Sequence, residues 1–254
     1  PTFYTRLLAN DRFDKTLSEH MRLFISGSAP LLAETHKQFE ARTGKKILER
    51  YGMTETNMST SNPYDGDRIA GTVGVPLPGV DVRIADEKGN LLSQGEIGII
   101  ELRGDNVFTG YWQMPEKTVE SFRPDGYFIT GDMARMDENG YITIVGRDKD
   151  LIISGGLNVY PKEVEGLIDA IEGVTESAVI AAPHKDFGEA VVAVIVRQNE
   201  KLTEEDIQQS LQDRLAKFKQ PKAVIFLDEL PRNTMGKVQK AALRKSYEKL
   251  FASA

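Results

Sequence analysis

Apolar and polar positions follow three different patterns along this chain, and each pattern predicts a different kind of region. In residues 3–55, short apolar runs alternate with stretches of helical periodicity. Arg22–Ser26 and Lys46–Glu49 predict two short strands of a parallel sheet. Between them, Leu31–Thr43 predicts a helix, with Gly44 as its C-cap.

The second pattern covers residues 71–147 and consists of short apolar runs separated by turns rich in glycine and charged residues. Val80–Ile84, Gly98–Arg103 and Tyr141–Val145 predict strands. Asn139-Gly140, directly before the last of these, is typical of a hairpin turn. We therefore expect a small, mostly antiparallel β subdomain.

The third pattern begins at Asp148 and mixes helices with strands. One helix is predicted at Pro161–Ala170, because proline is well tolerated in a first helical turn. Another is predicted after Thr203, which forms a capping-box pattern with Asp206. Strands are predicted at Ala178–Ala182, Ala190–Val196 and Lys222–Phe226.

Together these patterns predict a multidomain protein of mixed α/β and α+β class. Residues 1–70 are expected to form part of an α/β sheet subdomain, and residues 71–147 the antiparallel β subdomain. Residues 148–254 are expected to form a separate C-terminal α+β domain.

Composition narrows the classes of function. The chain has 40% hydrophobic and 28% charged residues and a net charge of −6, so it lacks the basic balance typical of nucleic-acid-binding proteins. It has no cysteine, and its three histidines show no metal-ligand spacing, which disfavours disulfides and a zinc site. No apolar run approaches the ~18 residues of a membrane span. No signal peptide is evident, and we expect a cytoplasmic protein without membrane contact.

Four short motifs follow one another in the chain: Tyr51–Glu55, Tyr127–Asp132, Gly146–Asp150 and Pro231–Lys237. In order and separation they resemble the nucleotide-handling motifs of the adenylate-forming superfamily, which includes acyl-CoA synthetases, adenylation domains of peptide synthetases, and luciferases. The resemblance extends over nearly the whole chain. It implies an acid–CoA ligase that uses ATP, Mg²⁺ and CoA to form first an acyl-adenylate and then a CoA thioester.

The first motif offers groups suited to a nucleotide. Tyr51 has a flat face for adenine, Thr54 a hydroxyl for an α-phosphate oxygen, and Glu55 a hard carboxylate for Mg²⁺. The resemblance adds Glu49, Arg50, Gly52 and Met53 to the nucleotide site. The alternative interpretation is a plain sheet-to-loop turn with a buried tyrosine.

A loop of small residues follows the first predicted strand: Gly27, Ser28, Ala29 and Pro30. Ligands of open α/β sheets bind at the carboxyl ends of strands, where this loop lies. The resemblance places it beside adenine and the acyl pocket. It is equally suited to be a strand-to-helix turn with Pro30 near the helix start.

Asp132 and Arg147 are candidates for the ribose. A carboxylate accepts hydrogen bonds from vicinal hydroxyls, and a guanidinium adds a second contact to ribose or phosphate. By itself, Thr130-Gly131-Asp132 also fits a turn capped by the aspartate. The resemblance favours the ribose role.

Four residues in the last region have roles implied by the resemblance. Lys237 is expected to carry the first chemical step by aligning the carboxylate with the α-phosphate. Lys149 is expected to be the hinge about which a mobile C-terminal domain turns. Gly155 and Gly156 either shape a tight turn or line a channel for the pantetheine arm of CoA. Without the resemblance, both lysines would be interpreted as solvated charges.

The amino-terminal segments look closest to malonyl-CoA and methylmalonyl-CoA synthetases. The second carboxylate of such a substrate needs cations or strong donors in its pocket, and Arg6, Ser28 and Arg50 match positions that supply them. Met58 is a candidate for limiting pocket depth. Arg6 could instead lie on a helix surface, Arg50 could serve the phosphates, and a fatty or aromatic acid could be the substrate.

The Ser/Thr/Gly-rich phosphate loop of the superfamily does not occur in this sequence, and the first residue is Pro1. We therefore expect a C-terminal half of a longer enzyme. Two alternatives stay open: a ligase that loads a carrier protein, and a fragment that binds adenosine without turnover. An acetyltransferase and deacetylase acting on Lys237 would be regulatory partners, since acetylation removes its charge.

Overall fold

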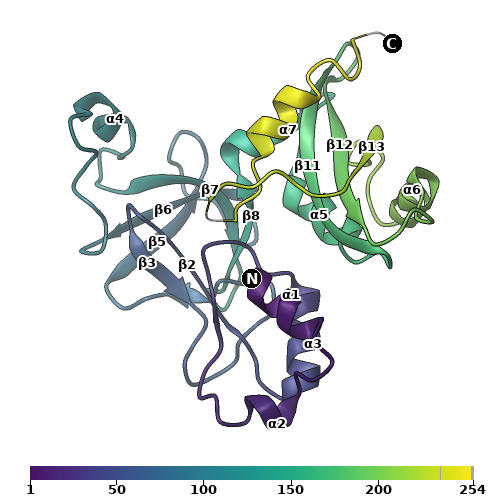
Figure 1. The fold of residues 1–254 in the computed structure, drawn as a ribbon. Helices are drawn as coiled ribbons and strands as arrows, with labels where there is room; N and C mark the ends of the chain where they lie inside the picture. Colours follow the sequence, from purple (N-terminus) through teal and green to yellow (C-terminus); the bar gives the residue numbers. More distant parts are fainter. Residues whose placement is uncertain (235, 253–254) are drawn as a thin grey trace. The chain divides into compact units, whose positions relative to one another are not determined.

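The computed structural model describes residues 1–234 and 236–252. The chain separates into two compact units, Pro1–Ile144 and Val145–Ala254 (Figure 1). The domain limits expected from the sequence, after residues 70 and 147, stay predictions. Met235, inside the last motif, and residues 253–254 lie outside the described residues.

The first unit begins with helices gathered around a short parallel strand pair. Strand β1 pairs in parallel with β2, which confirms the predicted parallel pairing, and Gly44 caps α3 in a left-handed conformation with φ of 70°. Phe39 of α3 is fully buried against Tyr4, Leu31 and Ile47. The bounds are α1 Thr2–Leu8, α2 Lys15–Ser18, β1 Ile25–Ser26, α3 Ala33–Thr43 and β2 Leu48–Met53.

Strand β2 extends further than its apolar pattern predicts. The expected strand ended at Glu49, whereas β2 continues to Met53 because it pairs antiparallel with β3, Asn57–Ser61. Only residues 54–56 form the turn. Most of the first motif therefore lies within a strand and not in a loop after it. Strand β4, Val75–Pro76, completes this sheet beyond β3.

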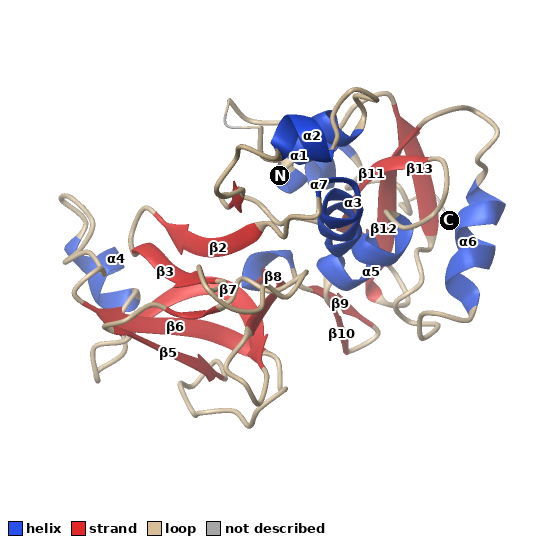
Figure 2. Cartoon of the chain, turned by 90° about the horizontal axis from the view of Figure 1, so that it is seen from below, coloured by secondary structure: helices blue, strands red, loops and turns tan. Residues whose placement is uncertain are grey.

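A second sheet in the first unit has the strand order β5-β6-β7-β8 and confirms the predicted antiparallel region. Figure 2 shows its long central strands and helix α4 at one end. Residues 137–140 form the turn between β7 and β8, with Gly140 at φ of 80°. The bounds are β5 Val80–Ala85, β6 Gly98–Gly104, α4 Pro115–Glu120, β7 Phe128–Met136 and β8 Ile142–Arg147.

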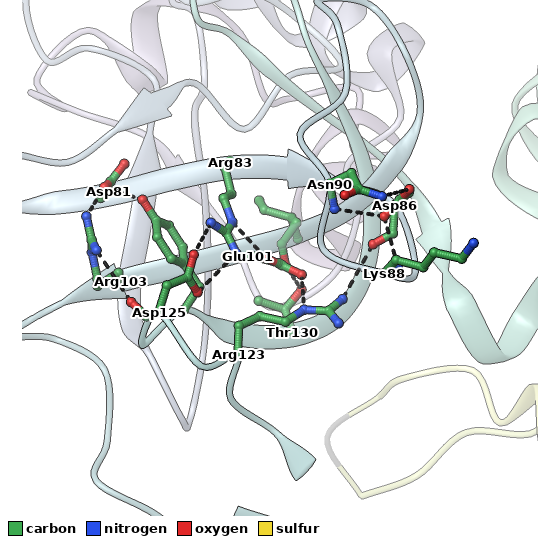
Figure 3. A network of polar contacts seen from close by, with 12 residues as sticks. Asp81, Arg83, Asp86, Lys88, Asn90, Glu101, Arg103, Arg123, Asp125 and Thr130 are labelled. Carbon is green, nitrogen blue, oxygen red and sulfur yellow. Dashed lines mark hydrogen bonds and ion pairs between the residues drawn. The ribbon is translucent and has the colours of Figure 1, made fainter. Parts of the chain in front are cut away.

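Charged side chains, and not only apolar ones, hold this sheet together. Glu101 on β6 is fully buried, and its two oxygens accept hydrogen bonds from Nε of Arg83 at 2.8 Å and Nε of Arg123 at 2.7 Å (Figure 3). Arg83 also binds Asp125 and stacks on the ring of Tyr127. We call Arg83, Glu101, Arg123 and Asp125 the Glu101 network. Both carboxylate oxygens of Glu101 thus have a hydrogen-bond partner, as a buried carboxylate requires.

The second unit is a sheet with helices on both faces. Alternate residues of the two longest strands point to opposite sides, so Val179 and Ala193 meet α5 and α6 while Ile180 and Val194 meet α7. Figure 1 shows α6 and α7 on opposite sides of these strands. The bounds are η1 Asp148–Asp150, β9 Ile152–Ser154, β10 Leu157–Val159, α5 Pro161–Ile168, β11 Val174–His184, β12 Gly188–Arg197, α6 Glu204–Gln212, β13 Ala223–Leu227 and α7 Lys240–Ser246.

Local sequence signals of the second unit are found where expected. Pro161 is in the first turn of α5, and the Thr203–Asp206 capping box begins α6. Glu165 of α5 was not expected to be buried. It is buried, accepts a hydrogen bond from the backbone N–H of Val179, and forms an ion pair with Lys240. In the described part of the chain, no helix combines the length and apolarity that crossing a membrane would need.

We expect stability to depend on the protonation of Asp169, the C-cap of α5. Burial raises the pKa of Asp169 to about 6, above the ordinary value of 3.8, and a negative charge is also unfavourable at a helix carboxyl end. The folded chain therefore holds this proton between about pH 4 and 6 while the unfolded chain loses it. The stabilising contribution of protonated Asp169 is therefore fully present below about pH 4 and is lost as the pH rises through about 6.

Asp169→Asn should remove this pH dependence and raise the free energy of unfolding by about 1–2 kcal/mol at pH 7.5. Asparagine keeps an oxygen for the 2.7 Å hydrogen bond from Ser177 Oγ. Urea unfolding at pH 4 to 8 measures the effect. Asp213→Asn, at the exposed C-cap of α6, is the matched control. Parallel stability curves for the Asp169 variant and the unchanged chain would contradict the prediction.

Candidate functional site

The first motif is built around a β-bulge between β2 and β3. Tyr51 pairs with Thr60 but the next residue, Gly52, pairs with Met58, so Ser59 is the extra residue. Here the strands approach very closely: a Cβ on Gly52 would lie 1.9 Å from the carbonyl oxygen of Asn57. Only glycine fits at position 52, so its role is steric, consistent with the close backbone approach that glycine permits.

The second motif is also a bulge, between β6 and β7. Ile99 pairs with Met133 and Glu101 with Ile129, which leaves three residues of β7, Thr130–Asp132, opposite Ile100 alone. Gly131 has φ of 70°, and Thr130 Oγ1 donates to the Ile100 carbonyl at 2.7 Å (Figure 3). The alternative of a capped turn is therefore wrong, because Asp132 lies inside a strand and is re-aimed by the bulge.

A hydrogen bond joins the two bulges. The Tyr51 hydroxyl donates to Asp132 Oδ2 at 2.6 Å, across 81 residues of sequence. Asp132 is buried and Tyr51 half-buried, and both make further contacts. The sequence placed these two residues in one site but did not predict that they touch. Tyr51 therefore has a hydroxyl anchored at one end and a ring lying half-exposed.

Glu55 sits on the turn between β2 and β3, and a second segment holds this turn. The backbone N–H of Phe108 donates to the Glu55 carbonyl at 2.8 Å, and the Tyr111 hydroxyl donates to Glu55 Oε1 at 3.1 Å. Asn106 Nδ2 donates to the Thr56 carbonyl at 2.6 Å. Thr54 is exposed and Glu55 half-buried. Sequence reasoning missed Asn106–Tyr111, although polar and aromatic residues directly after the strand predicted at Gly98–Arg103 were a usable signal.

The loop after β1 carries backbone strain. Ser28 has φ of 67°, which is rare for a residue with a side chain. Ser28, Ala29 and Pro30 are exposed. The loop connects β1 to α3, as its strand-to-helix interpretation describes, and Pro30 lies two residues before the Leu32 N-cap.

Of the residues predicted for the acyl substrate, the structure brings Arg50 of β2 close to the loop that carries Ser28. A Cβ on Gly27 would lie 3.4 Å from Arg50 Cγ, so the Arg50 side chain covers the start of the Ser28 loop. Arg50 is exposed on β2, and Met58 is half-buried on β3. Arg6 is exposed on α1, as its surface-helix alternative describes.

Glu49 points away from solvent. It is buried on β2, and its Oε1 lies 3.1 Å from Nδ1 of His36, which is buried on α3. The backbone N–H of Gly71 approaches the same oxygen at 3.4 Å. These contacts fix β2 against α3, and the role of Glu49 in the nucleotide site stays a prediction. His36, its partner, was not identified from sequence.

In the second unit, the tandem glycines form a tight turn. Gly155 and Gly156 have φ of 58° and 80° and connect β9 directly to β10, as a two-residue hairpin turn with positive φ requires. They turn between two strands and do not lead directly into the Pro161 helix. Both are exposed. The tip of this hairpin is thus bare backbone that a narrow ligand can approach.

Lys149 lies in the 3₁₀ turn η1 that follows the end of β8. The next residue, Asp150, is bound to Arg244 of α7 at 2.7 Å. Lys149 is exposed. Arg147, at the end of β8, is also exposed and interacts with a neighbouring residue. The carboxyl side of the predicted hinge is therefore fixed to the second unit.

Lys237 is exposed on a loop that its neighbours hold in shape. Arg232 and Val238 form an isolated antiparallel bridge, and Asn233 Oδ1 accepts the backbone N–H of Lys237 at 2.9 Å. Arg232 also binds the Gly236 carbonyl and the side chain of Glu176 on β11. The roles of Arg232, Asn233 and Glu176 were not predicted. They hold described residues on both sides of Met235, and the Lys237 side chain is exposed.

Comparison with known proteins places this geometry in context. The family description "AMP-binding enzyme" matches residues 1–112, and "AMP-binding enzyme C-terminal domain" matches residues 163–237. A long-chain-fatty-acid–CoA ligase of Yersinia pestis is 40% identical over 96% of this chain and 43% of its own length. A malonate–CoA ligase of Arabidopsis thaliana is 40% identical over 98% and 44%.

Among solved structures, ATP-bound MatB from Rhodopseudomonas palustris is 61% identical to the chain and has a TM-score of 0.97. It is matched over 99% of this chain and 50% of its own. The chain thus spans about half the length of the relatives it matches.

Proposed function

Because the chain belongs to the family of AMP-binding enzymes, we propose that it supplies the adenosine site and the catalytic lysine of an ATP-dependent acid–CoA ligase. The observation that carries this proposal is the 2.6 Å hydrogen bond between Tyr51 and Asp132. It joins two motifs, each on a bulge, that lie far apart in the sequence and that the resemblance assigns to adenine and to ribose. Such convergence of separate segments on one ligand is typical of a binding site.

The nucleotide would bind along this pair of bulges. Tyr51 would offer its ring to adenine, and Asp132 would accept the ribose hydroxyls. Arg147 is proposed as a second ribose or phosphate contact. The Gly27–Pro30 loop, Gly52 and Met53 would border the base, and Thr54 would donate to an α-phosphate oxygen from its exposed position on the turn.

Glu55 fits a magnesium ion. Mg²⁺ usually takes one or two carboxylates and completes its coordination with water and substrate phosphates. Glu55 has one oxygen bound to Tyr111 and is half-buried at the turn. In the described residues no group of three or more acidic, histidine or cysteine side chains could hold a metal. When bound, magnesium would neutralise phosphate charge.

In the first half-reaction, a carboxylate oxygen of the acid attacks the α-phosphorus of ATP and the bond to pyrophosphate breaks. Both reactants are anionic, so a cation must offset their repulsion and the charge that develops. We assign this role to Lys237, which is exposed on a loop held by Arg232 and Asn233. Acetylation of Lys237 by a partner enzyme would remove that charge and stop this step.

In the second half-reaction, the CoA thiolate attacks the carbonyl carbon of the acyl-adenylate and AMP leaves. We propose that Lys149 is the hinge that exchanges Lys237 for the Gly155-Gly156 hairpin between the two steps. The positive φ values and the exposed turn suit a channel for the pantetheine arm. The proposed location is the cytoplasm, where ATP and CoA are both available.

For the acid, we propose a small dicarboxylate such as malonate or methylmalonate. Arg50 covers the start of the Ser28 loop and provides a cation there. The malonate–CoA ligase relative and the 61% identity with MatB support this choice. The equally similar fatty-acid ligase and the 31% identical anthranilate–CoA ligase AuaEII favour an apolar or aromatic acid as the alternative.

The test is ATP- and acid-dependent formation of a CoA thioester by the full-length protein containing this chain. Malonate, methylmalonate, acetate, octanoate and benzoate would be compared, with Arg6→Leu and Arg50→Leu variants and Arg12→Leu as an exposed control. We expect malonate to be preferred and its kcat/KM to fall about 10–100-fold in the first two variants. Preference for a monocarboxylate would remove the dicarboxylate proposal and leave the ligase.

A fragment that binds adenosine without turnover is the non-enzyme alternative. AMP binding without thioester formation from any acid, by residues 1–254 alone, would favour it for this chain. Transfer to a carrier-protein thiol in place of CoA would favour the carrier-loading alternative.

A further inference from the structure

The Asn106–Tyr111 segment acts on the turn that carries Glu55. It makes three hydrogen bonds to that turn: from Asn106 Nδ2 to the Thr56 carbonyl, from Phe108 N–H to the Glu55 carbonyl, and from the Tyr111 hydroxyl to Glu55 Oε1. Their lengths are 2.6, 2.8 and 3.1 Å. Two of the three fix the backbone of the turn. Only the third reaches the carboxylate.

The aromatic ring of Tyr111 is itself fixed. It packs edge-on against Phe108 with 4.8 Å between ring centroids, and Phe108 contacts Phe128 at the start of β7. The backbone N–H of Tyr111 donates to Thr118 Oγ1 on α4 at 2.9 Å. The ammonium of Lys117 lies 4.4 Å from the centre of the Tyr111 ring. With both its backbone and its ring held, the hydroxyl has little freedom of position.

A fixed donor on one oxygen determines where the other oxygen lies. The Tyr111 bond occupies Glu55 Oε1, so the carboxylate presents Oε2 in a defined direction to a hard cation. Residues that orient a metal ligand in this way typically change metal affinity about 10–100-fold when removed. Half-burial of Glu55 adds to the effect, because a carboxylate in a partly dry site has fewer waters to replace the lost bond.

We propose that Tyr111 is a positioning residue for the metal-binding carboxylate Glu55, and that the Asn106–Tyr111 segment couples this turn to α4 and β7. The inference rests on the proposed function and deepens it, since it assigns a role to a segment outside the four motifs. Tyr111 touches neither substrate nor metal in this scheme. It acts only through Glu55.

The test uses Tyr111→Phe in the full-length protein, with Mn²⁺ as the probe for the metal. Electron paramagnetic resonance in the presence of ATP measures Mn²⁺ binding, and pyrophosphate release measures the first half-reaction over a range of Mg²⁺ concentrations. We expect Mn²⁺ affinity in the nucleotide complex to fall about 10-fold. The Mg²⁺ concentration for half-maximal rate should rise similarly, while thioester formation from preformed acyl-adenylate should be unchanged.

Tyr141→Phe is the matched control, because its hydroxyl donates to the carbonyl of Asp67 at 2.8 Å, away from Glu55. Metal affinity in Tyr111→Phe equal to that in Tyr141→Phe would overturn the inference and leave the ligase intact. Absence of metal-dependent nucleotide binding in the unsubstituted protein would overturn the proposed function as well. A fall in unfolding midpoint without a change in metal affinity would show a purely structural tyrosine and also overturn it.

Discussion

Lys237→Ala is expected to slow acyl-adenylate formation by about 10²–10³-fold, the usual effect of removing one preorganised group that stabilises a developing charge. The lysine is exposed on a loop whose shape depends on Arg232 and Asn233, so the substitution removes the charge without disturbing the fold. Pyrophosphate release measures this half-reaction. Thioester formation from synthetic acyl-adenylate and CoA should stay within about 3-fold of the unsubstituted rate, because the proposed mechanism gives Lys237 no role in that step.

Lys245→Ala is the control for this prediction, since Lys245 is also an exposed lysine near the carboxyl end, on α7. Its activity should match that of the unsubstituted protein. If Lys237→Ala slowed both half-reactions equally, the lysine would serve general nucleotide binding and the assigned step would be wrong. Retention of full activity would exclude a catalytic role.

Glu101→Gln is expected to lower the free energy of unfolding by about 3 kcal/mol, at the lower end of the cost of breaking a buried ion pair. Glu101 is fully buried and binds Arg83 and Arg123, so its loss removes a counter-charge from both arginines, although Arg83 still has Asp125. The two arginine side chains are 16% and 17% exposed, so some solvation is recovered. Urea unfolding measures the change.

The exposed pair Lys46–Asp67 provides the control for the Glu101 network. Its atoms are 3.9 Å apart and its side chains are 41% and 88% exposed. Lys46→Gln should change stability by less than about 0.5 kcal/mol, as exposed ion pairs contribute little. A loss in Glu101→Gln no larger than in this control would show that the network is dispensable for stability.

The fold was predictable where periodicity and local signals agreed. The strand expected at Gly98–Arg103 differs from β6 by one residue, and Thr203, Gly44 and the paired glycines behave as their chemistry requires. The extension of β2 to Met53 was not predictable, because Arg50 and Gly52 interrupt the apolar run and the added residues are held by pairing with β3. The two bulges could not be predicted from the sequence either, because the register of a strand depends on the partner strand with which it pairs.

The candidate site was predictable as a set of residue types but not as a set of contacts. A single sequence identifies Tyr51, Asp132 and Glu55 as suitable groups, yet their partners are chosen by tertiary packing. Tyr111 lies 56 residues from Glu55, and His36 reaches Glu49 from another element. Glu49 was grouped with the first motif because it neighbours it in the sequence, and its burial next to the equally buried Leu48 does not follow from strand alternation.

The bond between Tyr51 and Asp132 would make the proposed recognition of the base and of the sugar a single thermodynamic unit. If the two residues act as proposed, a change at either one alters the other, so their energetic costs cannot be added as independent terms. For a nucleotide that lacks its ribose hydroxyls, the loss of binding free energy would then differ between a variant at Tyr51 and a variant at Asp132. Selectivity for adenosine is in this sense a property of the pair, and neither motif can be tuned alone.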